Sequence, residues 1–486
     1  MALLHSFWYE EAEKAFRAIA EKDPKCAMAH WGVAMTNFRP LWYPTDRSTR
    51  EKMHEELVKA ESLKPRTARE RDYIAALLTY FRNPERTDHP ALMVQYEQAM
   101  EKLHQRYPRD KEAAIFYSLA LLGTAQAQPP DKSYARQRKA GAILEPLFAA
   151  QPDHPGLAHY LIHSYDFPTL AAQGLNAARR YARIAPAVPH ALHMPSHIFI
   201  RLGIWDDAIA SNRASAEAAR VYARSRGWEG AWDQQLHAMD YLAYAHLQKG
   251  EQGEAERVLD ELQGIQTGIP MSITSHYAFA AIPVRLAMES RRWEQTANLQ
   301  PRADASPWAA AMVHWARAVG AARSGKLEAA RQNLATLTAL RDQLRQSKVP
   351  FWTDQTEVLH LSAAAWVSQA EGKAQEAERL MRAAADLEDS TDKHPVTPGA
   401  ITPAREMLGD LLLELKRPKE ALAEYQASLK NAPNRFNGLY GAARAAEQAG
   451  DTSLARTFYN RLLETCGKEN TERKELDAAR SFIAMR

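Results

Sequence analysis

Apolar residues recur at helical spacing along most of the chain, in segments dominated by Ala, Glu, Leu, Gln and Arg. Runs of β-branched residues are short, so the pattern gives little support for strands. The amphipathic segments come in pairs separated by glycine and proline, which predicts helical hairpins. Because one hairpin cannot bury its apolar face alone, we expect an all-α solenoid of stacked hairpins. The first helices of the pairs would line a concave inner groove.

Two consecutive segments near the carboxyl end repeat one arrangement of small and aromatic residues. Gly409 and Gly441 lie 32 residues apart, and Ala421 and Ala455 lie 34 residues apart. In AREMLGDLLLELKRPKEALAEYQASLKNAPN, the small residue, the alanine, the aromatic residue and the final proline are Gly409, Ala421, Tyr425 and Pro433. This order resembles the tetratricopeptide repeat, a helix-turn-helix unit of about 34 residues.

The resemblance covers most of the chain, apart from an irregular stretch from about Asn37 to Pro65. The chain is also similar to bacterial tetratricopeptide proteins with no characterised activity. The resemblance therefore implies the fold and the groove, and it carries over no catalytic residue. Seams rich in proline divide the chain into four predicted parts. These are irregular repeats at 1–128, central repeats with the histidines at 129–300, further repeats at 301–394 and regular repeats at 395–486.

Composition disfavours several classes of function. The 486 residues carry a net charge of only +3 and no basic stripe with interleaved aromatics, so we expect no nucleic-acid partner. The two cysteines, Cys26 and Cys466, indicate neither a disulfide framework nor a cysteine metal knuckle. No run reaches the roughly 18 to 20 apolar residues that span a bilayer, so we expect a soluble chain without a membrane partner. The cytoplasm is the default compartment, with the periplasm as the alternative if a leading signal segment was removed.

Histidines recur at the spacing of one helical turn in three successive predicted hairpins. PHALHMPSHIF has spacings of three and four, HYLIHSYD repeats the spacing of four one unit earlier, and HAMDY follows one unit later. When the repeats are aligned on their close-packing alanines, these side chains fall on the side of the first helices that faces the groove. The predicted metal ligands are His159, His163, His190, His193, His197 and His237.

This spacing suits coordination of a metal ion. Residues four apart on a helix have Cβ atoms about 5 to 6 Å apart, and neighbouring helices lie about 8 to 10 Å apart. Imidazoles from two hairpins can therefore share one ion. We expect a divalent transition metal, with zinc favoured and copper or iron as alternatives. The preferred set is His193 and His197 with either His163 or His237.

Acidic and phenolic side chains beside these histidines extend the prediction to catalysis. Asp240 and Asp166 are candidates for a fourth ligand, for orienting an imidazole or for a general base. Tyr244 and Tyr165 are candidates for donating a hydrogen bond to a bound oxyanion. Three protein ligands leave one position of the metal open, so this hypothesis includes a metal-dependent enzyme acting on a small molecule.

Two competing interpretations stand beside the enzyme. An adaptor would hold a peptide or protein partner in the groove, and metal storage or delivery would need no catalysis. Pro195 bears on the geometry, since proline is tolerated only in the first turn of a helix. A helix that begins at Pro195 would place His190 and His193 on a preceding loop. The two side chains would then no longer be predicted to point into the groove, although they would stay near His197.

Overall fold

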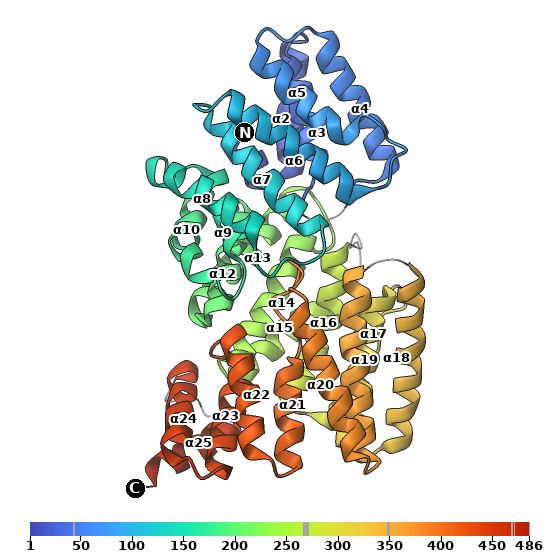
Figure 1. The fold of residues 1–486 in the computed structure, drawn as a ribbon, viewed down its shortest axis with the longest axis vertical. Helices are drawn as coiled ribbons and strands as arrows, with labels where there is room; N and C mark the ends of the chain where they lie inside the picture. The colour runs from blue at the N-terminus through green and yellow to red at the C-terminus, as the bar shows by residue number, and fades with distance from the viewer. Residues whose placement is uncertain (42–43, 266–271, 348–349, 468–469, 471, 486) are drawn as a thin grey trace. The chain divides into compact units, whose positions relative to one another are not determined.

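The computed structural model describes residues 1–41, 44–265, 272–347, 350–467, 470 and 472–485. Over these residues the secondary structure consists of α-helices α1 to α25 and one short 3-10 helix, η1, without a strand (Figure 1). The all-α fold expected from the sequence is therefore confirmed. The chain divides into two compact units, Met1–Ile198 and Phe199–Arg486.

In the first unit each helix from α2 to α11 packs against its neighbour in the chain. Further contacts join α3 to α5 and α7 to α9, and the short α1 packs on α2 and α9. The helices are α1 (Ala2–His5), α2 (Tyr9–Lys22), α3 (Ala27–Asn37), α4 (Arg47–Ser62), α5 (Ala68–Phe81), α6 (His89–Arg106), α7 (Lys111–Ala127), α8 (Ala135–Ala150), α9 (Pro155–Tyr165), α10 (Ala171–Ile184) and α11 (Pro189–His193). The next helix, α12 (Pro195–Leu202), begins in the first unit and ends in the second.

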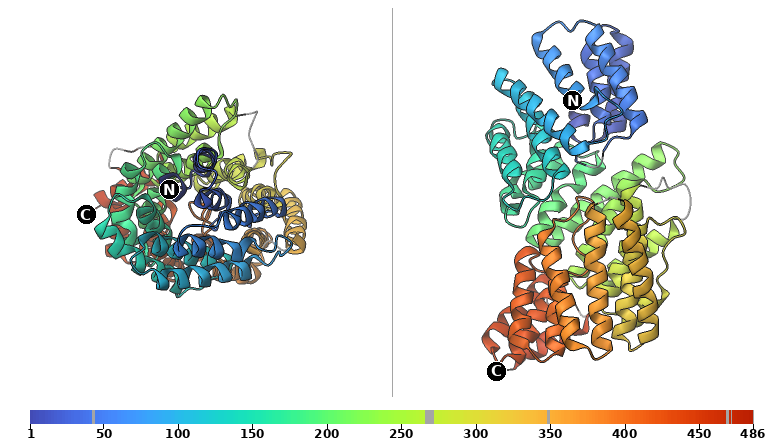
Figure 2. Two further views of the ribbon diagram at one scale, coloured as in Figure 1. Left: turned by 90° about the horizontal axis from the view of Figure 1, so that it is seen from above. Right: turned by 45° about the vertical axis from the view of Figure 1, so that its right-hand side comes forward.

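The second unit repeats the same plan with longer helices. Contacts between alternate helices join α14 to α16, α17 to α19, and α19 through α21 to α23, which makes these helices the inner row. The right-hand view of Figure 2 shows α17 to α20, in yellow to orange, as long neighbouring helices. The elements are α13 (Trp205–Ser225), α14 (Asp233–Gln248), α15 (Gln252–Gly264), α16 (Ile273–Glu289), η1 (Trp293–Asn298), α17 (Pro307–Arg323), α18 (Leu327–Ser347), α19 (Pro350–Ala370), α20 (Ala374–Ser390), α21 (Ala404–Glu414), α22 (Pro418–Asn431), α23 (Phe436–Gln448), α24 (Thr452–Cys466) and α25 (Lys474–Ala484).

Glycine and tyrosine explain why the last hairpins pack closely. The ring of Tyr425 on α22 is fully buried and lies against Gly409 and Gly441. A Cβ atom would lie 2.7 Å from this ring at Gly409 and 2.3 Å from it at Gly441, so a larger residue would clash at either position. The Tyr425 hydroxyl donates to Oδ1 of Asp410 at 2.6 Å, which satisfies its buried polar group. This packing agrees with the roles that the resemblance implies for Gly409 and Tyr425.

The turns inside these hairpins share one backbone geometry. Gly450 follows α23 with φ 83°, and Lys416 follows α21 with φ 61°. At both turns a pair of main-chain N–H groups donates back to carbonyls of the last helical turn, at 2.9 to 3.1 Å. The left-handed conformation closes the helix end, and glycine adopts it without the steric cost that a side chain adds.

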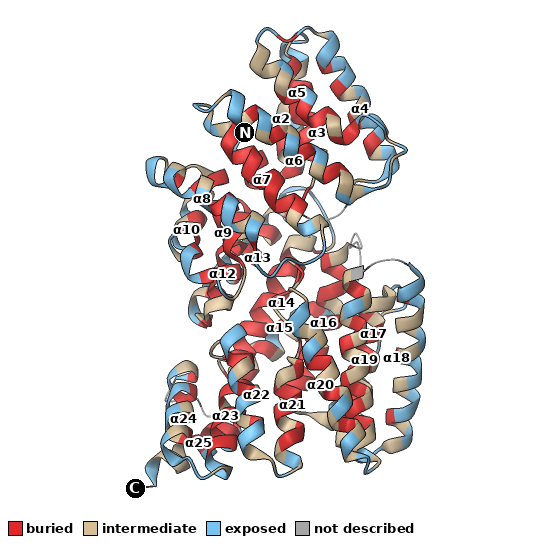
Figure 3. Cartoon of the chain, in the orientation of Figure 1, coloured by how far each residue is buried: buried red, intermediate tan, exposed pale blue. Residues whose placement is uncertain are grey.

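Burial follows the hairpin interfaces. Figure 3 shows buried residues where helices face one another and exposed residues on the outer surfaces. Helix α7 is buried from Ala113 to Thr124 because α6, α8 and α9 surround it. By contrast, α2 buries only Tyr9 and Ala12 among its own residues. None of the described helices combines the length and the apolar character needed to cross a membrane.

Part of the stretch predicted to be irregular is helical. Helix α4 covers Arg47–Ser62 and buries Arg50, Met53, Leu57 and Ala60, a spacing typical of an amphipathic helix. The side chain of Asp46 caps it by accepting the Thr49 N–H. The stretch departs from the repeat pattern in sequence, yet these residues form an ordinary amphipathic helix. The tetratricopeptide pattern of small residues is missing there, and that pattern was the signal used to recognise hairpins.

A helix does begin at Pro195, as its restricted backbone suggested. Met194 separates α12 from the five-residue helix α11, which carries His190 and His193. These two histidines lie on a short helix rather than on a loop. The prediction that these histidines point into the groove assumed one continuous helix that also carries His197. The break at Pro195 removes that assumption.

Candidate functional site

Five histidines of the first unit gather in what we call the imidazole cluster. His159 and His163 lie on α9, His190 and His193 on α11, and His197 on α12. All are buried except His163, which is half-buried. The structure thus brings together five of the six histidines that the sequence predicts as metal ligands.

Within the cluster, His159, His163 and His190 form a histidine triad. Nε2 of His159 lies 3.1 Å from Nε2 of His190 and 3.1 Å from Nε2 of His163. The ligand atoms of the three residues all lie within 4.8 Å of one another. Such convergence of ring nitrogens is uncommon among buried histidines, whose nitrogens usually meet hydroxyls, carbonyls or carboxylates.

A main-chain carbonyl fixes the ring of His159. Its Nδ1 lies 2.6 Å from the carbonyl oxygen of His5, which can only accept a hydrogen bond. Nδ1 therefore carries the hydrogen, and Nε2 presents its lone pair to the other two imidazoles. Burial lowers the pKa of His159 to about 3, although the bond to the His5 carbonyl acts in the opposite direction. The ring is neutral at physiological pH, which is the form that binds metals.

A carboxylate fixes His197 in the same manner. Oδ2 of Asp166 accepts from Nδ1 of His197 at 2.8 Å, so Nε2 of His197 presents a lone pair as well. Nε2 of His193 lies 3.0 Å from that atom. This contact is compatible with the orienting role, one of the three that the sequence left open for Asp166, and that role stays a prediction. Tyr165 donates to Glu145 at 2.6 Å, so its hydroxyl is engaged outside the cluster.

The amino-terminal segment covers the histidine triad. The ring of Phe7 lies 4.4 Å from the ring of His159, 5.9 Å from that of His163 and 5.6 Å from that of His190, measured between centroids. On another side, the ring of Tyr181 stacks on His159 at 5.1 Å. These aromatic rings reduce the access of water to the triad and lower the local dielectric constant.

His5 joins this segment to a second polar group. Its Nε2 donates to Glu112 at 2.9 Å, and its Nδ1 accepts from the Tyr160 hydroxyl at 3.1 Å. His154 donates to the other oxygen of Glu112 at 3.2 Å. Burial acts to raise the pKa of Glu112, but hydrogen bonds from His154 and His5 outweigh it and hold that pKa well below its usual range. Sequence reasoning overlooked His5, because only the folded chain brings it to residues about 150 positions later.

The remaining predicted site residues lie on α14 in the second unit. His237 is buried, with its ring 5.1 Å from that of Tyr241, and its role as a metal ligand stays a prediction. Asp240 faces the buried guanidinium of Arg285, with 3.4 Å between Oδ1 and Nε. Burial raises the pKa of Asp240 to about 6 against the opposing charge of Arg285.

Tyr244 on α14 belongs to a buried ionic network. Its hydroxyl accepts from Arg435 at 2.9 Å, and Arg435 also pairs with Glu289 and Glu406. Arg435 is fully buried, so its guanidinium depends on these carboxylates to satisfy its N–H donors and to compensate its charge. The contacts of Tyr244 are those of a structural residue, and its predicted catalytic role remains untested.

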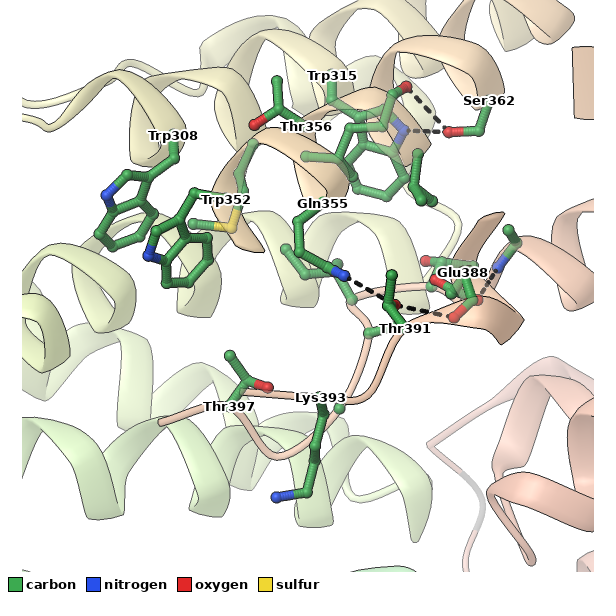
Figure 4. Close-up of a pocket in the computed structure, with 18 of the residues that line it drawn as sticks. Trp308, Trp315, Trp352, Gln355, Thr356, Ser362, Glu388, Thr391, Lys393 and Thr397 are labelled. Carbon is green, nitrogen blue, oxygen red and sulfur yellow. Dashed lines mark hydrogen bonds between the residues drawn. The ribbon is translucent and has the colours of Figure 1, made fainter. Parts of the chain in front are cut away.

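The second unit contains an aromatic pocket of about 120 Å³, lined by α16, α17, α19, α20, α21 and residues 391–402. Figure 4 shows the indoles of Trp308 and Trp352 side by side at this pocket. The two rings stack with centroids 4.0 Å apart and an interplanar angle of 11°. Nε2 of Gln355 donates to the Thr391 hydroxyl at 3.2 Å, and the Trp315 indole donates to Ser362 at 2.9 Å.

Part of the pocket wall belongs to what we call the resident segment, residues 391–403 between α20 and α21. The Tyr241 hydroxyl donates to the carbonyl oxygen of Thr397 at 3.0 Å and lies 3.3 Å from that of Pro395. The Arg285 guanidinium donates to the carbonyl of Ala400 at 3.0 Å. Helices α14 and α16 therefore hold a non-helical stretch of chain mainly through its backbone.

Comparison with known proteins identifies the repeats at the carboxyl end. The family model described as tetratricopeptide repeat matches residues 363–436 and 406–470. No curated protein matches the chain.

Several solved helical-repeat proteins align with nearly the whole chain at low similarity. The tetratricopeptide domain of P58(IPK) is 13% identical, with coverage of 100% of this chain and 97% of that one and a TM-score of 0.22. Yeast Tom70 is 11% identical, with coverage of 98% and 91% and a TM-score of 0.36. The Naa15/Naa10 structure with HypK-THB is 12% identical, with coverage of 98% and 71% and a TM-score of 0.26. These scores are too low to transfer a function.

Proposed function

Since this chain is a tetratricopeptide repeat protein, we propose that it is an adaptor that binds an extended segment of a peptide or protein partner on the inner face of its second unit. The observation that carries the proposal is the way α14 and α16 hold the resident segment. Tyr241 and Arg285 donate to main-chain carbonyls of that segment, so this face already accommodates a non-helical backbone. Donors aimed at carbonyls recognise a chain whatever its side chains are.

The aromatic pocket supplies the selectivity that backbone contacts lack. A cavity of about 120 Å³ is close to the size that holds a benzene-sized group. Its walls include the stacked indoles of Trp308 and Trp352 and the side chains of Met312 and Met407. We therefore expect the partner to insert one aromatic or branched aliphatic side chain there, while its backbone runs along the inner helices.

A peptide array tests the proposal. The full chain is applied to immobilised random dodecapeptides, and the affinities of the retained peptides are measured by fluorescence anisotropy. We expect the retained peptides to share one large apolar residue. Trp308→Ala removes a wall of the pocket and should weaken their binding by about 10-fold or more, as is usual for a tryptophan anchor.

Trp228→Ala is the matched control, because Trp228 is 44% exposed and contacts Tyr222 and Trp232 rather than the pocket. This variant should bind the same peptides as the unaltered chain does. Failure to retain any peptide, or equal binding by both tryptophan variants, would contradict the adaptor.

A further inference from the structure

In the first unit, a hydrogen bond at Nδ1 fixes the orientation of two imidazole rings, those of His159 and His197. The His5 carbonyl holds Nδ1–H of His159, and the Asp166 carboxylate holds Nδ1–H of His197. In metalloproteins a ligating histidine almost always donates its other N–H to a carbonyl or a carboxylate, which sets the tautomer and the ring angle. Both kinds of support are present here, and both direct an Nε2 lone pair toward further imidazoles.

The spacing within the histidine triad fits one metal ion. Tetrahedral coordination at the usual zinc–nitrogen distance of about 2.0 to 2.1 Å places two ligating nitrogens about 3.3 Å apart. The two measured separations from Nε2 of His159 are both 3.1 Å. One imidazole lone pair serves a single hydrogen-bond donor well, whereas one cation between the three rings would satisfy three lone pairs together.

The surroundings of the triad also suit an ion. Phe7 and Tyr181 cover two sides of His159, and low-dielectric walls strengthen the attraction between nitrogen lone pairs and a cation. His163 is half-buried, so one ligand borders the solvent and an ion has a route of entry. Three protein ligands would leave a fourth position for water or for a ligand of another kind.

From this geometry we infer that His159, His163 and His190 bind one divalent transition-metal ion, with zinc favoured. His5 is the positioning residue of this site, because its main-chain carbonyl orients His159. The site lies wholly in the first unit and is independent of the peptide face of the second unit. The inference therefore goes beyond the proposed adaptor function, and either can fail without the other.

The test uses zinc alone on the full chain, purified without an affinity tag. Elemental analysis of the isolated protein should find about one zinc per chain. The chain is then stripped with a chelator and titrated with zinc chloride in competition with a chromophoric chelator. His159→Gln and His163→Gln should each weaken zinc binding by at least about 100-fold, because each removes one of three ligands.

Two controls keep the result interpretable. His104→Gln removes an imidazole on α6 whose ring stacks on Tyr117, and it should leave zinc affinity unchanged. Circular dichroism checks that each variant folds, and half-buried His163 serves as the test position if the His159 variant does not. Cobalt substituted for zinc should give the visible bands of a four-coordinate ion in the unaltered chain and lose them in His163→Gln.

Three outcomes would overturn the inference. The first is a stripped chain that binds no zinc in competition with the chelator. The second is unchanged zinc affinity in both His159→Gln and His163→Gln. The third is loss of binding in His197→Gln but not in His163→Gln, which would assign the ion to the His193 and His197 pair instead.

Discussion

The position of His5 depends on the absence of a side chain at Gly156. A Cβ atom there would lie 2.7 Å from Nδ1 of His5. The His5 ring cannot easily move aside. It stacks on Phe116 with ring centroids 5.0 Å apart, and it is hydrogen-bonded to Tyr160 and Glu112. The backbone carbonyl of the same residue orients His159, so crowding at Gly156 reaches the histidine triad without touching a ligand.

Gly156→Ala should therefore destabilise the first unit and weaken zinc binding together. We expect the free energy of unfolding to fall by about 1 to 3 kcal/mol, the usual cost of overpacking. Zinc affinity should fall by about 10-fold, as is typical when an orienting group is disturbed. Urea unfolding and the chelator competition measure the two quantities.

Gly253→Ala is the matched control for this prediction. Gly253 is the second residue of α15, as Gly156 is of α9, and its added Cβ would meet only a Glu472 carboxylate oxygen at 3.4 Å. Alanine there should leave stability unchanged or raise it by up to about 1 kcal/mol, since alanine favours helix. Equal effects of the two variants would mean that Gly156 has no special contact with His5.

Glu388 should make the stability of the second unit depend on pH. Burial raises its pKa to about 7, aided by the charges of Asp389 and Glu406 and opposed by the Ala404 N–H and by Arg435. The folded state therefore binds a proton that the unfolded state releases near pH 4.5. The contribution of Glu388 to stability is therefore lost as the pH rises from about 4.5 through 7, by up to about 3 kcal/mol.

Glu388→Gln removes this proton uptake and keeps an oxygen to accept the Ala404 N–H. In urea unfolding at pH 5 and pH 8, the variant should gain stability over the unaltered chain mainly at pH 8. Glu464→Gln changes an exposed glutamate of the same unit and should show no such pH-dependent gain. A constant difference between Glu388→Gln and the unaltered chain at both pH values would refute this assignment.

For individual residues, the sequence was sufficient to locate the imidazole cluster but not to assign a role to each histidine. Spacings of three and four, read against the repeat, were sufficient to group His159 and His163 with His190, His193 and His197. Which nitrogen of each ring carries the hydrogen depends on contacts that spacing does not encode. The carbonyl that orients His159 comes from a residue 154 positions earlier in the chain.

Among the helical elements, the turn inside each hairpin offers a matched pair of positions. Lys416 and Gly450 lie 34 residues apart, have φ of 61° and 83°, and close equivalent helix ends. A left-handed conformation costs a residue with a side chain about 1 to 2 kcal/mol, and glycine avoids most of this cost.

Introducing glycine at one of these turns and removing it from the other should shift stability in opposite directions. Lys416→Gly should raise the free energy of unfolding by about 0.5 to 1 kcal/mol, and Gly450→Ala should lower it by about 1 to 2 kcal/mol. Urea unfolding followed by circular dichroism measures both. Changes of the same sign in the two variants would show that backbone conformation does not limit these turns.

The sequence predicted the hairpins best where small and aromatic residues mark them. The ring of Tyr425 lies against both Gly409 and Gly441, so the spacing of these residues carried direct information about helix packing. Helix α4 packs without such a signature and was overlooked. The separation of α11 from α12 was anticipated only as one alternative, because Pro195 can either begin a helix or kink one.

For the whole molecule, the inferred zinc ion and the proposed peptide would bind to different units, so each should stabilise a different part of the chain. A ligand that binds only the folded state stabilises it by about 2.7 kcal/mol at a free concentration 100 times its dissociation constant. Local opening is suppressed most in the elements that contact the ligand, and hydrogen exchange reports this by segment. The inferred zinc ligands lie on α9 and α11, whereas the proposed peptide contacts lie on α14, α16, α17 and α19.

Hydrogen exchange of the full chain with zinc should therefore slow in α1, α9 and α11 and remain unchanged in α17, α19 and the resident segment. A peptide selected on the array should produce the opposite pattern. His163→Gln should abolish the zinc effect while leaving the peptide effect intact, since it removes a metal ligand far in sequence from the peptide face. Protection by zinc that is equal in α9 and α19 would show that the ion acts on the chain as one cooperative body, and the assignment of separate ligands to separate units would then be wrong.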